Sequence, residues 1–437
     1  MAENWTTLHA PRKRKWVVAH FMVGNTFPYR MEDWINDIRM AHAHGIDGFA
    51  LNVGREDWQR HRVSDCYEAA LQAEVPFKLF LSFDMTSIPA SCQGDICVLN
   101  DYVAAFAKHP SQLLYEGKAL VSTFAGKNSL FGFSNLSAAW RYAKAVLEQT
   151  APIHLVPSFF INPGRYPEIH AMDGYFNWNG SWPLHLTPRS PRDEIECPRL
   201  DTDYHHLHHL GGRTFMAAVS PWFFTHYGID SWNKNWVYRG DDWLFVRRWE
   251  QLIAMRERVD IVQIISWNDY GESHYIGPIK GAQPNSEAWV DGFPHEAWLH
   301  LNGYYAKAFK DGRYPKIEGD RIYMWSRPHL KEARAPDTVP RPDNWELADD
   351  AFWVVVFAVA PATIRLSTSD EDHAQSVAVQ AGVSKLSHRM VAGDSMKGQL
   401  FRAGVLVTEC APSSDDFCFR EHPQVYNFNA YVAMSSV

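Results

Sequence analysis

The feature that most constrains the fold is a repeated alternation of short apolar runs with longer amphipathic segments, which extends from residue 15 to about residue 312. The apolar runs are near-continuous rather than alternating, as is typical of strands covered on both faces of a sheet. There are eight such runs, at 16–23, 48–53, 77–83, 119–124, 153–160, 174–178, 214–220 and 262–267.

The segments between the runs have helical character. In 31–45, for example, the apolar residues share one face and Gly45 offers a C-cap. Eight strands that alternate with helices predict an α/β fold, a (β/α)8 TIM barrel over residues 15–315, after an N-terminal extension at 1–14. A doubly wound open sheet is the competing fold. The strand count and the missing glycine-rich nucleotide turn favour the barrel.

The pattern changes after Gly312, where breaker clusters such as RAPDTVPRPDN at 334–344 separate short strand-like runs. No helical period is evident in this part of the chain. It therefore predicts a C-terminal antiparallel β-sandwich at 318–437. The predicted strands are 321–325, 351–359, 362–369, 376–382, 404–409 and 424–433.

Composition limits the partners. The net charge of −8 argues against nucleic acid, whose binding needs a basic surface. No run of 18 or more apolar residues occurs, so no membrane partner is expected. The chain is expected to be a monomer, although nothing in the sequence fixes its oligomeric state. The first sixteen residues have no apolar core like that of a signal peptide, which leaves the compartment open. The six cysteines fit two local disulfides or free thiols equally well.

The ends of the predicted strands carry most of the polar chemistry. In a TIM barrel the active site lies at the C-terminal ends of the strands. These positions hold amides, hydroxyls, carboxylates, an imidazole and aromatics but no lysine or arginine, so a phosphate or carboxylate substrate would find no matching charge. Aromatics make up 14 % of the chain, with 18 Trp, and offer faces on which sugar rings stack. An uncharged polyol is the substrate class that fits.

The last strand leads into SWNDYGESH at 266–274, which places Asp269 and Glu272 three residues apart. A protonated and an ionised carboxyl group in one cleft are what glycoside hydrolysis requires. Asp84 is a third candidate, able to hold a sugar hydroxyl or to tune neighbouring pKa values. The structural alternatives are a turn residue for Asp269, an ion-pair partner for Glu272 and a buried core histidine for His20. Trp178, Trp182 and Trp222 could likewise be core residues, although their position at strand ends favours the cleft.

Other motifs are weaker. TDYHHLHHLGG at 202–212 holds four histidines, two of which could face a metal on one helical turn, but no confirming carboxylate or cysteine spacing accompanies them. A solvated helix end is the default interpretation, and no metal or other cofactor is expected. The patterns G-x-S-x-G, G-x-G-x-x-G and the P-loop are all absent.

Three segments resemble the fungal α-1,3-glucanases, or mutanases, of glycoside hydrolase family 71: VVAHFMVGNT at 17–26, DWINDIRMAHAHGIDGFALNVG at 33–54 and SWNDYGESHYIGP at 266–278. RIYMWSRPH at 321–329 is similar to the start of that family's C-terminal β domain. The resemblance implies a barrel plus a β-sandwich, and endo-acting, inverting hydrolysis of α-1,3-glucan, a fungal cell-wall polymer. Members are usually secreted, and many carry a leader sequence, from which this chain departs.

The resemblance also implies which residues act. The two catalytic acids of the family fall on Asp269 and Glu272, with Glu272 assigned as general acid and Asp269 as the base that orients water. The remaining strand-end residues are expected to bind the glucan by stacking or through hydroxyl groups. The stacking residues are Trp178, Trp182, Trp222, Tyr227 and Trp267; the hydroxyl-binding residues are His20, Asn52, Asp84, Asn179, Asn268 and His274.

Two rival functions stay open from the sequence. The first is a hydrolase of another α-linked glycan, such as an α-mannan or a mixed α-glucan. The second is a glucan-binding or wall-organising protein without turnover, although a pure binder has no need of both acids. The predicted sandwich is expected either to buttress the barrel or to bind glucan itself.

Overall fold

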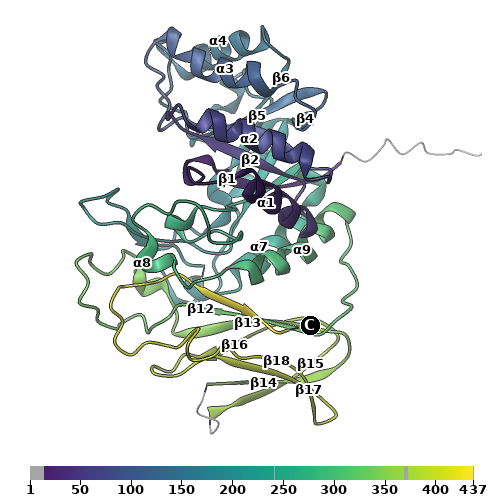
Figure 1. Ribbon diagram of the computed structural model, residues 1–437, viewed down its shortest axis with the longest axis vertical. Coiled ribbons are helices and arrows are strands. Elements are labelled where there is room, and N and C mark those ends of the chain that lie inside the picture. Colours follow the sequence, from purple (N-terminus) through teal and green to yellow (C-terminus); the bar gives the residue numbers. More distant parts are fainter. Residues whose placement is uncertain (1–13, 241, 369–372, 437) are drawn as a thin grey trace, which may run out of the picture.

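The computed structural model describes residues 14–240, 242–368 and 373–436. Nearly all of the predicted extension at 1–14 lies outside these residues. Two parts follow each other along the longest axis, an α/β part built from the first three quarters of the chain and a set of antiparallel sheets below it (Figure 1).

One curled sheet organises the α/β part. It has nine strands, all of which run parallel except the two-residue β4. The hydrogen-bonded order runs from β6 through β5, β3, β2, β1, β11 and β8 to β7. The sheet is curled, and its two outermost strands, β6 and β7, lie in contact. The strands are β1 Trp16–Met22, β2 Gly48–Val53, β3 Lys78–Asp84, β4 Leu114–Tyr115, β5 Lys118–Phe124, β6 Ile153–Ser158, β7 Gly174–Asn177, β8 Thr214–Val219 and β11 Ile261–Ile264.

Each of the eight predicted apolar runs is a strand of this sheet, as expected. Successive side chains point to opposite faces of a strand. Val18 and Ala50 therefore join a cluster on one face, whereas Val17 and Phe49 join the main core on the other. Burial on both faces explains why the runs are continuously apolar.

Helices cover the outer face of the sheet between successive strands (Figure 1). The helical segment predicted at 31–45 is present as α1. The helices are α1 Met31–Ala43, α2 Gln59–Gln72, α3 Ile96–Phe106, α4 Leu136–Glu148, α5 Arg192–Glu196, α6 Thr202–Leu210, α7 Leu244–Ala254, α8 Glu287–Val290 and α9 Glu296–Asp311.

Two four-stranded antiparallel sheets form the C-terminal part. Their orders are β16-β13-β12-β19 and β15-β14-β17-β18. Side chains of both sheets, such as Met324 and Leu400, share one apolar cluster. The strands are β12 Arg321–Ser326, β13 Ala351–Ala358, β14 Ala362–Ser367, β15 Gln375–Val379, β16 Gly382–Arg389, β17 Lys397–Arg402, β18 Val405–Cys410 and β19 Tyr431–Met434. All six predicted runs contribute a strand, whereas β16 and β17 were not predicted because polar residues interrupt their apolar pattern.

The two parts share a tightly bonded interface. The indole nitrogen of Trp222 donates to the Phe428 carbonyl at 2.8 Å, and Nε2 of His295 lies 2.8 Å from the Ala430 carbonyl. The Asn429 amide donates to the Trp289 carbonyl at 2.9 Å. Residues 427–430, just before β19, therefore pack against the α/β part.

Two further expectations concern the whole chain. The six cysteines are all free thiols, which decides between the two alternatives left open by their spacing. Within the described residues, no helix combines the length and the apolar surface that crossing a bilayer needs.

Candidate active site

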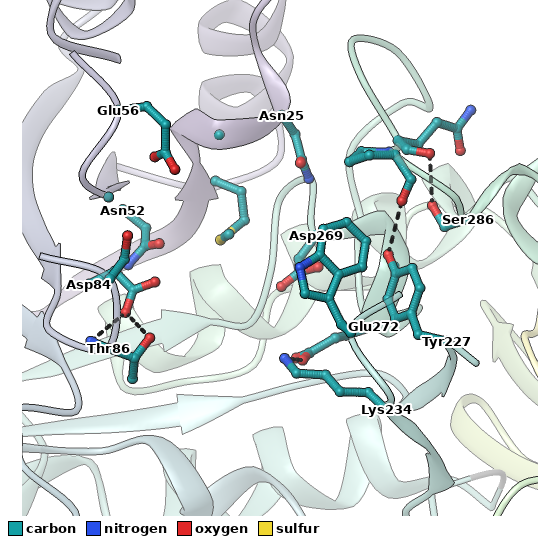
Figure 2. Close-up of a pocket in the computed structure, with 18 of the residues that line it drawn as sticks. Asn25, Asn52, Glu56, Asp84, Thr86, Tyr227, Lys234, Asp269, Glu272 and Ser286 are labelled. Carbon is teal, nitrogen blue, oxygen red and sulfur yellow. Dashed lines mark hydrogen bonds and ion pairs between the residues drawn. The ribbon is translucent and has the colours of Figure 1, made fainter. Parts of the chain in front are cut away.

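A pocket of about 480 Å³ opens at the C-terminal ends of the parallel strands. Its walls come from the ends of β1, β2 and β3, from the turn after β11, from a hairpin that follows β8 and from the loop at 283–286. In Figure 2, Asn52, Glu56 and Asp84 lie on one side, and Tyr227 and Lys234 on the other, with Asp269 between them.

The turn that carries the two candidate acids is built from SWNDYGESH. β11 ends at Ile264, and a short 3-10 turn spans Tyr270–Glu272. Asn268, which is fully buried, pairs with β1 because its side chain accepts from the Met22 amide at 2.7 Å and donates to the Met22 carbonyl at 3.1 Å. This clamp fixes the turn at the strand ends. Asp269 and Glu272 then both line the pocket.

A buried polar network ties the acids together. The backbone amide of Asp269 donates to Oγ of Ser266 at 2.8 Å. The same hydroxyl lies 3.1 Å from Nδ1 of His274, whose Nε2 lies 3.1 Å from Oε2 of Glu272. The Glu272 carboxylate is therefore positioned by His274, and the same serine holds both this imidazole and the backbone of Asp269.

The two carboxyl groups have opposite pKa shifts. Burial, together with the negative charge of Glu272, raises the pKa of Asp269 to about 6. Burial also acts to raise the pKa of Glu272. The hydrogen bond from His274 and the positive charge of Lys234, whose Nζ lies 3.2 Å from Oε1, outweigh it and lower that pKa to about 2. Near pH 4, Asp269 holds a proton and Glu272 is ionised.

These shifts favour the reverse of the division of labour that the family resemblance implies. The acid with the raised pKa is the one suited to donate a proton, and here it is Asp269 rather than Glu272. The ionised Glu272 is suited to act as the base.

The pair also bears on metal binding. Within the described part of the chain, three potential metal ligands lie close together, namely Asp269, Glu272 and His274. One ligand atom of each lies within 4.8 Å of those of the other two. Nε2 of His274 is already committed to Glu272. We interpret the cluster as an acid pair with its positioning imidazole rather than as a metal centre.

The four histidines at 202–212 lie on α6, which ends at Leu210 with Gly211 as its C-cap. Nδ1 of His206 is hydrogen-bonded to the Tyr166 hydroxyl, while His205 and His208 are exposed. The arrangement agrees with the default expectation of a helix end in solvent.

Three other predicted site residues line the pocket. Asn52 is the last residue but one of β2, Asp84 ends β3 and Tyr227 follows the strand β9. One oxygen of Asp84 accepts from the Thr86 amide and hydroxyl at 2.9 and 2.6 Å. The rule that strand ends carry the site located all three.

The predicted stacking tryptophans do not line the pocket. Trp267 is fully buried and packs on Phe49, with ring centroids 5.2 Å apart. Trp222 is buried against the C-terminal part. Trp178 and Trp182 join Phe223 in the cluster on the inner face of the sheet. A buried indole has no free face for a sugar ring, so the prediction of stacking at these positions is corrected.

Several predicted hydroxyl-binding residues also lie elsewhere. His20 is buried beside Trp178 at a centroid distance of 4.8 Å, as in the alternative of a core histidine, and burial with the nearby His274 lowers its pKa to about 3. His274 and Asn268 are fully buried and support the acid-bearing turn. Asn179 is exposed but lies outside the pocket.

Several pocket residues escaped the sequence analysis, among them Trp232, Lys234, Glu56 and Gln59. Trp232 and Lys234 lie in the polar turn SWNKNW at 231–236. This turn comes after Tyr227, the last site residue that was predicted beyond the strand at 214–220. Glu56 and Gln59 belong to the loop and helix after β2. Lys234 corrects the expectation that no lysine or arginine is present. The signal that could have found the first two is the hairpin pattern of aromatic runs around a polar turn.

A pair of acids with separated pKa values, in an open pocket of amides, carboxylates and one exposed indole, defines the class of glycoside hydrolases. The family profile described as "Glycosyl hydrolase family 71" matches residues 13–437. The chain belongs to glycosyl hydrolase family 71.

Individual relatives agree with the family. A glucan endo-1,3-alpha-glucosidase of Schizosaccharomyces pombe is 38% identical over 96% of this chain and 94% of its own length. A mutanase of Penicillium rubens is 34% identical over 97% of this chain and 90% of its own length. Among solved structures, a family GH99 endo-alpha-mannosidase from Bacteroides thetaiotaomicron aligns with a TM-score of 0.48 and 13% identity, covering 69% of this chain and 99% of that one.

Proposed function

We propose that the protein hydrolyses α-1,3-glucosidic bonds within α-1,3-glucan. The observation that carries this proposal is the acid pair Asp269 and Glu272, which lies in a pocket open to solvent and has pKa values about 6 and about 2. The glucan endo-1,3-alpha-glucosidase among the relatives supports the linkage and the internal cleavage.

The proposed reaction uses the two acids in complementary states. Asp269 donates its proton to the oxygen of the leaving sugar, while Glu272 accepts a proton from the attacking water. His274 and Lys234 keep Glu272 ionised, and the Ser266 hydroxyl holds the His274 ring and the backbone amide of Asp269. The water oxygen bonds to the anomeric carbon as the glycosidic bond breaks, and the two side chains transfer the protons, so the proposed reaction uses no cofactor.

We propose inversion at the anomeric carbon, as the family resemblance implies. The nearest oxygens of the two carboxyl groups lie within 4.8 Å, whereas inverting pairs are typically about 6.5–9.5 Å apart and retaining pairs about 5–5.5 Å. Inversion therefore requires the carboxyl groups to move apart when a sugar and a water enter between them.

The glucan would lie across the pocket. Trp232, whose side chain is half exposed, offers a stacking face on one wall, and Asn52 and Asp84 offer hydroxyl partners on the other. Tyr227 supports the tryptophan at a ring-centroid distance of 4.5 Å. An open pocket with partners on both walls accommodates the interior of a chain and suits endo action.

The same proposal extends to the architecture. We infer that the parallel sheet is a (β/α)8 barrel over residues 15–315, because its strands follow one another in sequence order and its outer strands touch. We infer a β-sandwich at 318–437 from the apolar cluster shared by the two antiparallel sheets.

The test is digestion of a panel of insoluble glucans and α-mannan, measured as new reducing ends. We expect activity on α-1,3-glucan. Activity confined to a polymer without α-1,3 bonds would replace the substrate. Tight binding to α-1,3-glucan without new reducing ends would replace the hydrolase with a binding protein.

A further inference from the structure

A two-stranded hairpin forms one wall of the pocket. It consists of β9 Phe224–His226 and β10 Asn235–Val237, joined by the loop 227–234. The loop brings Trp232 to the pocket and places Lys234 on Glu272. A contact that holds this hairpin in place therefore also holds the proposed stacking residue Trp232 and the positive charge of Lys234 beside Glu272.

The hairpin is held from behind by the segment 337–343, which belongs to the connection between β12 and β13. The backbone amide of Val237 donates to the Asp343 carbonyl at 3.0 Å, and the Asp343 amide donates to the Asn235 carbonyl at 3.0 Å. The Asn235 side-chain amide donates to the Pro340 carbonyl at 2.7 Å. These bonds make the segment an additional partner of β10.

A buried ion pair reinforces the attachment. Nε2 of His226 lies 2.9 Å from Oδ2 of Asp337, and Nδ1 lies 2.8 Å from Oδ1 of Asn235. The bond from Asn235 to Pro340 fixes which end of its amide faces the histidine. Both ring nitrogens thus lie within hydrogen-bond distance of an oxygen atom. Because its partner is a carboxylate, the link to Asp337 is a charge-assisted hydrogen bond in a protected position.

Close packing transmits this attachment to the acids. A Cβ atom on Gly228, in the hairpin loop, would lie 2.9 Å from Cγ2 of Val339. A Cβ atom on Gly271, between the two candidate acids, would lie 2.0 Å from the Tyr227 hydroxyl. The segment 337–343 therefore packs against the hairpin, and the hairpin packs against the acid-bearing turn.

We propose that Asp337 is a positioning residue for the reaction, which acts through His226 and Asn235 by fixing the hairpin that carries Trp232 and Lys234. The C-terminal part of the chain would thereby hold a wall of the active site. This inference rests on the proposed function for its kinetic consequence but not for its structural one.

The structural arm of the test is amide hydrogen exchange of the hairpin in Asp337→Asn. We expect exchange over residues 228–234 to rise about tenfold or more, because loss of the ion pair frees the loop to open locally. Asp320→Asn is the matched control, since Asp320 holds Arg402 with two bonds of 3.0 and 2.9 Å in the C-terminal part. It should leave the hairpin unchanged. Unchanged exchange in Asp337→Asn would overturn the proposal.

The kinetic arm measures kcat/KM on soluble α-1,3-oligoglucans. Asp337→Asn should lower it by about 10- to 100-fold, while Asp320→Asn stays within about twofold of wild type. If Asp337 acts through the hairpin, adding Asp337→Asn to the double variant Trp232→Ala/Lys234→Met should cost less than about twofold more. Fully additive losses would overturn the proposal.

A second variant guards against misfolding. Asn235→Ala removes the side-chain bonds to Pro340 and His226 but keeps the backbone bonds to Asp343, and it should raise exchange over the same loop. Wild-type protein that leaves α-1,3-glucan intact would refute the proposed function. The exchange arm would still decide whether Asp337 fixes the hairpin.

Discussion

Asp269 and Glu272 are three residues apart in one turn, yet their surroundings separate their pKa values. Asp269 faces the negative charge of Glu272 with little compensation, whereas Glu272 is bonded to both Lys234 and His274. Two like charges this close oppose each other, so the pair holds one proton near pH 4. The sequence could propose the pair, but the division of roles that the family resemblance implied is the reverse of the one that these pKa values favour.

The roles can be separated with an activated substrate. For an α-1,3-oligoglucosyl fluoride, whose leaving group needs no proton, Asp269→Asn should retain most of its activity, while Glu272→Gln should lose about 10²–10⁴-fold. On the polymer both variants should lose activity by a similar factor. Fluoride release that survives in Glu272→Gln but not in Asp269→Asn would restore the division of labour implied by the family resemblance.

Lys234 gives a pH prediction. kcat/KM should fall below the pKa of Glu272, where the base becomes protonated, and above the pKa of Asp269, where the acid loses its proton. Lys234 lowers both values, so Lys234→Met should shift both limbs of the profile to higher pH, the acid limb more because Lys234 bonds Glu272 directly.

A pH–rate profile of kcat/KM between about pH 2 and 8 checks this. His274, Asp269, His20, Tyr227 and Tyr238 also face Glu272 and are unchanged in the variant. Lys385→Met is a control, because Lys385 pairs with Glu250, which belongs to α7. An unmoved acid limb in Lys234→Met would contradict the assigned role of the lysine.

At the scale of single residues, the sequence located five pocket residues because strand ends in such a sheet carry the chemistry. These are Asn52, Asp84, Tyr227, Asp269 and Glu272. The same rule misplaced Trp178 and Trp222, because it gives the position of a residue along a strand but not the direction of its side chain. Which indole is buried depends on packing against distant residues such as Phe428.

At the scale of elements, the hairpin after β8 contributes as much to the pocket as any single strand. The eight strands were predictable from their continuous apolar runs. The hairpin was not predictable, because each of its strands is only three residues long and contains polar as well as apolar residues. The C-terminal ends of β5, β6 and β7 do not line the pocket, because aromatic side chains such as Phe124 and Phe160 pack against each other there.

The contact between the hairpin and the acid-bearing turn is directly testable through Gly271. A methyl group there collides with the Tyr227 hydroxyl, so Gly271→Ala should displace the turn and lower kcat/KM by about 100-fold. Gly319→Ala, whose Cβ would meet nothing within 4 Å, should leave activity unchanged. Because the hydroxyl is the closest atom, Tyr227→Phe should partly restore Gly271→Ala. Wild-type kinetics in Gly271→Ala would contradict the packing described.

At the scale of the whole molecule, the two parts share one core. Tyr323, Trp325 and Phe428 of the C-terminal part belong to the same apolar cluster as the outer face of the parallel sheet. The sequence predicted a second β-rich part from its breakers and short strands. It left open whether that part supports the α/β part or binds glucan, because a contact between segments 200 residues apart, such as that of Trp222 with Phe428, leaves no local pattern.

The shared core predicts a single cooperative transition for the full chain in differential scanning calorimetry. Deletion of residues from 318 onward should give insoluble or unfolded protein, because it exposes the buried faces of Trp222 and Trp298. Two resolved transitions, or a soluble α/β part with normal kinetics on short oligoglucans and weaker polymer binding, would instead show that the C-terminal part is a separate glucan-binding module.

The most direct test of the central claim is proton NMR of the first products released from α-1,3-glucan by the wild type, Asp269→Asn and Glu272→Gln. The account predicts a β-configured reducing end from the wild type, which mutarotates to the equilibrium mixture, and almost no product from either variant. Wild-type turnover in either variant would contradict the assignment of the acid pair, and an α-configured first product would contradict inversion.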